Sequence, residues 1–176
     1  MTRTVEGIRI FRGPQGVPEG ALRRFVGTTD RESQAALDRC KDLLIAVTHW
    51  VPPRGAASAG VEGWKARTPE WFVRACAPDV FPARAEASRA DDGQPWAFAD
   101  WIRWFDQSSG LQRSWRWWDG GITGDADFWI EVEVFEAPAV GALTWMMRAA
   151  GARSVAEAAR PGRSAGVSRS GPGSGR

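Results

Sequence analysis

Two aromatic stretches decide the fold: residues 114–118 read Ser-Trp-Arg-Trp-Trp, and residues 128–135 read Phe-Trp-Ile-Glu-Val-Glu-Val-Phe. Segment 119–127 between them is rich in Asp and Gly, which tight turns favour. We therefore predict two strands, 112–118 and 128–135, joined by a loop. Eight of the eleven tryptophans lie close to this pair, which places the core there: Trp96, Trp101, Trp104, Trp115, Trp117, Trp118, Trp129 and Trp145.

The second stretch has two different faces, because side chains alternate across a strand. One face is aliphatic and is expected to be core; it carries Ile130, Val132 and Val134. The other face is aromatic and acidic, and a binding surface is expected there; it carries Trp129, Glu131, Glu133 and Phe135. Cross-strand pairing is expected to set Arg113 or Arg116 against one of the two glutamates.

The N-terminal part predicts a strand and then a helix. Residues 5–12 alternate, which is typical of a short half-buried strand, and the Gly/Pro-rich segment 13–20 ends it. Segment 21–27 fits either a helical turn or a strand. A helix is predicted from Thr29, whose hydroxyl forms a capping box with Glu32, to the Pro52-Pro53 pair, with His49 at its C-terminal end.

Three further helices are predicted from their starts. They begin at Thr68-Pro69-Glu70, at Pro95 and at Ala137-Pro138, and the last one ends at a left-handed cap on Gly151. Segment 54–63 has the small residues of a surface loop, and 82–93 fits a loop or a weak exposed helix.

The expected fold is therefore α+β: a small antiparallel sheet packed on one face by three to four helices. We expect a single domain over residues 1–152, followed by a flexible basic tail over 153–176 that is disordered from Pro161. The tail carries a net charge of +4 and the rest of the chain −2, within a total of +2. A nearly neutral body argues against a dedicated nucleic-acid-binding domain.

Composition excludes several other classes. No apolar run approaches the roughly 20 residues that span a bilayer, and the N-terminus has no signal-peptide core, so a cytoplasmic protein is expected. Cys40 and Cys76 are expected to be buried free thiols. Of 23 basic residues only two are lysines, a bias typical of GC-rich coding, so the arginines alone do not indicate phosphate binding.

Catalytic and metal-binding patterns are scarce. One histidine and two scattered cysteines do not form a structural zinc set, and the phosphate-binding and nucleophile-elbow motifs are absent. Asp119, Asp125 and Asp127 are interpreted as turn residues rather than a calcium loop. The Glu131–Glu133 pair is interpreted as solubilising charge rather than a glycosidase pair, whose carboxylates flank the substrate from separate elements. No cofactor or metal is expected.

Segment 96–151 resembles small, uncharacterised, Trp-rich actinobacterial proteins. The resemblance rests on Trp117-Trp118 and on the Val-Glu-Val strand that leads through Pro138 to a Leu-x-Trp-x-x-Arg-Ala-Ala-Gly helix. No activity is known for those proteins, so the resemblance implies no functional residue.

The sequence favours a non-catalytic, cytoplasmic protein-binding module, of the immunity or antitoxin kind that masks an enzyme with a basic surface. One alternative is a binding protein or enzyme that holds a carbohydrate or other small ligand in a Trp-lined cleft. Another is weak nucleic-acid binding through the basic tail, and a Trp-rich core without any binding role also accounts for the aromatics. The candidate partner-binding residues are Trp104, Trp115, Arg116, Trp117, Trp129, Glu131, Glu133 and Phe135.

Overall fold

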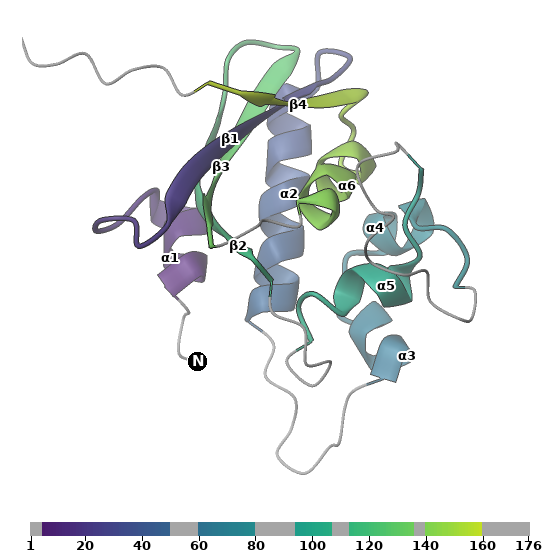
Figure 1. The fold of residues 1–176 in the computed structure, drawn as a ribbon. Coiled ribbons are helices and arrows are strands. Elements are labelled where there is room, and N and C mark those ends of the chain that lie inside the picture. The colour runs from purple at the N-terminus through teal and green to yellow at the C-terminus, as the bar shows by residue number, and fades with distance from the viewer. Residues whose placement is uncertain (1–4, 50–59, 80–93, 107–112, 136–139, 160–176) are drawn as a thin grey trace, which may run out of the picture.

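The computed structural model describes residues 5–49, 60–79, 94–106, 113–135 and 140–159. Its centre is a four-stranded antiparallel sheet with the order β2-β3-β1-β4. The strands are β1 (Ala21–Thr28), β2 (Trp115–Ile122), β3 (Asp127–Val134) and β4 (Ser154–Ala158). Helices contact this sheet, which confirms the predicted α+β class (Figure 1).

The helices occupy both sides of the sheet. On one side lie the long helix α2 (Ser33–Thr48) and α6 (Gly141–Ala149), and beyond them the short helices α3 (Gly60–Lys65), α4 (Glu70–Ala75) and α5 (Phe98–Ile102). On the other side, Figure 1 shows α1 (Val5–Arg12) near one end of the strands. We call the α2 side the inner face of the sheet and the α1 side the outer face.

The core lies between the inner face and α2. Ile130 and Val132 are fully buried and Val134 nearly so, which confirms the predicted aliphatic core face. A chain of aromatic rings extends this core towards α4 and α5, because the Trp101 ring centroid lies 4.4 Å from those of both Phe72 and Phe105.

The predicted capping box at the start of α2 is only half formed, because the helix begins at Ser33 with Glu32 as its N-cap residue, and the Thr29 backbone N–H donates to the Ala126 carbonyl rather than to Glu32. The Thr29 hydroxyl accepts the Glu32 backbone N–H at 3.0 Å and itself donates to the Ala126 carbonyl at 3.0 Å. It therefore fixes the helix start against the turn between β2 and β3. His49 caps the other end of α2, as predicted, and its backbone N–H donates to Ile45.

The prediction of a strand over residues 5–12 is wrong, because this segment is helix α1. Glu6, Arg9 and Ile10 are its buried side chains, at the spacing of one helical face. Two of these three buried residues are charged and form ion pairs with the sheet region. The alternation of Ile8 and Ile10 therefore indicated a strand where charged residues in fact form the buried face of a helix.

Several element boundaries differ from the predicted ones. The undecided segment 21–27 belongs to strand β1, residues 60–63 of the predicted loop begin α3, and β2 continues to Ile122 beyond a bulge between Trp117 and Asp119. The Thr68 hydroxyl donates to the Trp64 carbonyl at 2.9 Å instead of capping α4. The helix that was predicted to start at Pro95 is α5, which begins three residues later, at Phe98.

The tail does not start at residue 153, because Ser154–Ala158 forms β4 and pairs with β1. This run of Ser, Val, Ala and Glu has little intrinsic strand preference, so the neighbouring strand determines its conformation. Gly151 before it has a φ of 122°, in keeping with the predicted cap. The predictions for 50–59, 82–93, the start at Ala137-Pro138 and the disordered segment from Pro161 lie outside the described residues.

Candidate interaction surface

The outer face of the sheet is the one that carries Arg24, Trp129, Glu131 and Glu133, since these positions pair across β1 and β3. It has two parts. The covered part lies beneath α1 and includes Glu133 and Trp118. The open part includes Val26 and Trp129, both partly exposed.

Glu133 is the centre of the covered part and is only 1% exposed. Its carboxylate accepts the backbone N–H of Gly20 at 3.0 Å, the N–H of Glu19, and Arg9 Nη1 at 3.2 Å. Burial alone would raise the pKa of Glu133, but these three donors outweigh it and the pKa is lowered. The Arg9 guanidinium also lies 4.2 Å from the centroid of the Trp118 ring.

Glu6 connects α1 to the edge of β2. Its carboxylate accepts the Trp117 backbone N–H at 2.7 Å and forms an ion pair with Arg113. The Arg113 guanidinium lies 4.6 Å from the ring centroids of both Phe105 and Trp115, so it is held between two aromatic rings. The first turn of α1 therefore supplies the acceptor that the bulged strand lacks.

Arg24 and Trp129 dominate the open part. The Arg24 guanidinium stacks 3.9 Å from the centroid of the Trp129 ring, and Arg24 Nη2 lies 3.4 Å from Glu131 Oε1. Beneath the indole is Gly121, where a Cβ would come within 2.9 Å of the ring, so the absence of a side chain allows the indole to lie close to β2. Trp129 is thus fixed from both sides while part of it stays exposed.

Four of the predicted partner-binding residues are not accessible. Glu131 and Glu133 are 3% and 1% exposed, and Trp115 and Trp117 are 0% and 1% exposed. The expectation that the acidic strand face is an open surface is wrong for both glutamates, because α1 and Arg24 supply partners that enclose them. The two tryptophans lie on the inner face with Val132 and Val134, within the core.

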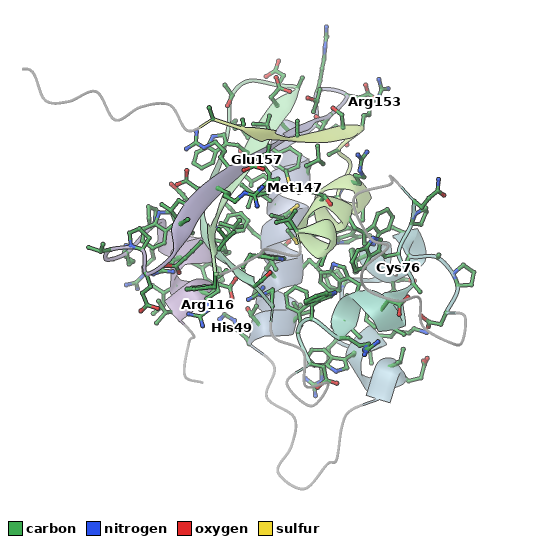
Figure 2. All side chains as sticks on the ribbon, in the orientation of Figure 1. His49, Cys76, Arg116, Met147, Arg153 and Glu157 are labelled. Carbon is green, nitrogen blue, oxygen red and sulfur yellow. The ribbon has the colours of Figure 1, made fainter. Side chains whose placement is uncertain are left out.

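The other four predicted residues reach the surface at three places, because Arg116 and Phe135 lie together. Arg116 is exposed on β2 and stacks 4.8 Å from the centroid of the Phe135 ring (Figure 2). Trp104 packs partly buried against the core beyond α5, away from the sheet's outer face. Trp129 is partly exposed in the open part of that face, and Arg116 is exposed on the same face beside the covered part, opposite Glu133 in the strand register. The Trp-lined cleft of the ligand-binding alternative would need Trp115, Trp117 and Trp129 together, but Trp129 lies on the opposite face of the sheet.

Sequence reasoning missed the basic partners Arg9 and Arg24 and the acid Glu6. The expected cross-strand partners of the glutamates were Arg113 and Arg116. In the structure Arg116 does lie opposite Glu133 in the strand register, but Arg9 makes the ion pair. If residues 5–12 had been predicted as a helix, Glu6 and Arg9 would have been placed on one face. No local pattern predicts the role of Arg24, because the residues it contacts lie more than 100 positions away in the chain.

The remaining candidates have structural roles. Asp119 lies in β2 at the bulge and accepts the Gly120 N–H, and Asp127 begins β3 and accepts the hydroxyl of its cross-strand neighbour Thr28, each at 2.8 Å, so these two aspartates are strand residues and not the turn residues that were predicted. No group of three metal-ligating side chains is found within the described segments. Both cysteines are free: Cys40 is fully buried, and burial raises the pKa of partly buried Cys76 to about 12.

Within the part of the chain that the structure describes, no helix is long and apolar enough to cross a membrane. Comparison with protein-family models gives no match, and comparisons with curated proteins and with solved structures give none either.

Proposed function

We propose that this protein is a protein-binding module whose contact surface is the open part of the outer sheet face, centred on Trp129 and Arg24. The observation that carries the proposal is the stacked pair itself: an indole and a guanidinium 3.9 Å apart on a sheet face that no described helix covers there. Trp and Arg are the residue types most enriched among interface hot spots.

The pair is already arranged for binding. Gly121 supports one side of the indole and Arg24 the other, so Trp129 loses little conformational freedom when a partner contacts it. Glu131 holds Arg24 from below, which neutralises the guanidinium charge. The open part therefore offers an apolar ring with a neutralised ion pair, and the fitting partner brings an apolar or aromatic anchor.

This chemistry changes the partner that was expected. A basic partner is the expectation from an acidic side made of Glu131, Glu133, Asp125 and Asp127, but both glutamates are buried and paired, which leaves only the two aspartates of that set at the surface. Masking of an enzyme, as immunity proteins and antitoxins do, is still the role we propose, with recognition through the indole rather than through acidic charge.

Site-specific photo-crosslinking in cells of the source organism tests the surface. A benzophenone amino acid at Val26, beside Trp129 on the outer face, is expected to trap one defined protein. The same group at Val17, which is 84% exposed in the segment before β1, is the control and is expected to trap none specifically.

Calorimetry with the purified partner completes the test. Trp129→Ala is expected to weaken its affinity by about 30-fold or more, as hot-spot truncations do. Trp71→Ala removes a comparable partly buried indole from α4 and is expected to change it less than about twofold. Equal affinity for the wild type and the Trp129 variant, with both folded, would show that the surface is wrong.

A further inference from the structure

One edge strand of the sheet, β2, is contacted by a helix, whereas no described strand pairs with the free side of the other edge strand, β4. On the β2 edge, α1 is in contact and Glu6 accepts the Trp117 backbone N–H at 2.7 Å. Covering an edge with a helix is one way in which proteins prevent strand pairing with other chains. On the other edge, β4 pairs with β1 alone, and no described strand lies beyond it.

The residues along β4 are small or exposed, so the edge is open to another strand. Ser154, Ala156 and Glu157 are exposed, and Val155 is partly buried against the core. Figure 2 shows Arg153 at one end of this strand and Glu157 towards the other. Charges of opposite sign therefore flank Val155 at equal distances along the sequence, two residues on either side.

This pattern is complementary to itself. When two copies of β4 run antiparallel with Val155 opposite Val155, Arg153 of each copy lies opposite Glu157 of the other. Val155 and Glu157 share one face of β4, and Arg153, in the bend just before the strand, would continue that alternation once β4 is extended by one residue in the pair. Within each copy, Arg153 already pairs with Asp30, and Glu157 with Arg23. Each Arg153–Glu157 pair between the copies would then be flanked by Asp30 of the copy that gives Arg153 and by Arg23 of the copy that gives Glu157. This makes two rows of four charges, and the sign of the charge alternates along each row.

We propose that β4 is a self-association edge, on which a second copy of this chain pairs antiparallel about Val155 to give a continuous eight-stranded sheet. The two-fold axis of this pair is perpendicular to the sheet and passes midway between the two Val155 residues, so the outer faces of both copies lie on the same side of the joined sheet. The pair would present two copies of the Trp129 surface to one side. The inference does not depend on the proposed function, since it concerns the strand edge and not the outer face.

The association is expected to be weak, because two five-residue edges form an interface well below the standard size. Sedimentation equilibrium of the full chain from about 1 µM to about 1 mM covers the affinities of such contacts. The expected result for the wild type is a reversible monomer–dimer equilibrium. A wild type that stays monomeric over this whole range overturns the proposal.

Charge exchange identifies the edge and its register. Arg153→Glu and Glu157→Arg each set two like charges opposite each other twice, so each variant alone is expected to be monomeric. Mixed in equal amounts, the two variants are expected to form a heterodimer, because one copy then carries two acids opposite two bases. The double variant Arg153→Glu/Glu157→Arg is expected to dimerise with itself.

Folding is not at risk in these variants, since the side chains of Arg153 and Glu157 are 70% and 44% exposed. Circular dichroism of each variant checks this directly. Ala21→Glu, at an exposed position of β1 remote from β4, is the control and should dimerise like the wild type. Dimers that persist in Arg153→Glu, or single variants that do not associate when mixed, overturn the proposed pairing.

Discussion

Arg9 and Glu133 form a buried ion pair at 3.2 Å, although 124 positions separate them in the chain. The pair joins an eight-residue helix to the end of β3, an interior strand of the sheet. A helix this short is not stable alone in water, so its ion pairs and Ile10 hold it in place.

Replacing Glu133 with Gln is expected to lower the free energy of unfolding by about 3 kcal/mol, because it leaves the Arg9 charge buried without a partner. The amide still offers an oxygen to the Glu19 and Gly20 N–H groups, so the loss reports mainly the charge. Urea unfolding followed by tryptophan fluorescence measures it. Glu157→Gln, in an exposed pair, is the control and is expected to change stability by less than about 1 kcal/mol. Similar values for both variants would contradict the burial of the Arg9–Glu133 pair.

Stability is expected to fall in acid through the same carboxylate. The pKa of Glu133 is lowered in the folded state from an ordinary value of 4.5, so the folded protein binds this proton less readily than the unfolded chain does. Its contribution is present above 4.5 and is lost as the pH falls through 4.5 towards the folded pKa. Urea unfolding repeated at several pH values should therefore show a smaller acid loss in Glu133→Gln than in the wild type. Parallel curves for the two proteins would count against this role.

Adjacent glycines of β2 should respond differently to alanine. At Gly120 a Cβ would come within 2.6 Å of the buried Trp117 ring and 3.2 Å of Leu37, so Gly120→Ala is expected to destabilise the fold by about 1–3 kcal/mol. At Gly121 it would meet the partly exposed Trp129 ring, which can shift towards solvent by displacing only the Arg24 side chain that stacks on it, whereas the Trp117 ring is enclosed by the core. Gly121→Ala is therefore expected to destabilise less in thermal unfolding. The reverse order of melting temperatures would be inconsistent with the assigned faces.

Acrylamide should quench only part of the tryptophan emission. Trp101, Trp115 and Trp117 are at most 1% exposed, whereas Trp129 is partly exposed. Trp129→Phe is expected to reduce the quenchable fraction, while Trp117→Phe leaves it unchanged. An unaltered quenchable fraction in the Trp129 variant would show that this indole is enclosed.

Both thiols are expected to resist modification in the folded protein. Burial raises the pKa of both, that of Cys76 to about 12, so almost no thiolate is present at about pH 8. A thiol-specific reagent such as Ellman's is expected to react slowly without denaturant and with both cysteines in guanidinium chloride. Rapid reaction of one equivalent in the native protein would place a thiol at the surface.

The sequence predicted what local patterns control. The β2–β3 pair, the aliphatic core face and the hydrogen bond from the Glu32 N–H to the Thr29 hydroxyl follow from alternation, turn residues and local side-chain bonding, all of which act over a few positions. Helix α1 was missed because tertiary ion pairs bury its charged face, and β4 because its residues become a strand only beside β1. The same dependence on distant residues explains the candidate site: alternation predicts the strand face on which Trp129 lies, but the burial of Glu131 and Glu133 depends on arginines contributed by β1 and α1.

The position of β1 between β3 and β4 has a consequence for synthesis of the chain. Its two neighbours begin at Asp127 and Ser154, about 100 residues or more after β1 itself leaves the ribosome. Until then the central strand has neither hydrogen-bonding neighbour, and α1 lacks Glu133. Such distant pairing makes folding slow and leaves intermediates exposed to aggregation. Assembly of this sheet is therefore a late event, completed only after the residues of β4, 154–158, have emerged.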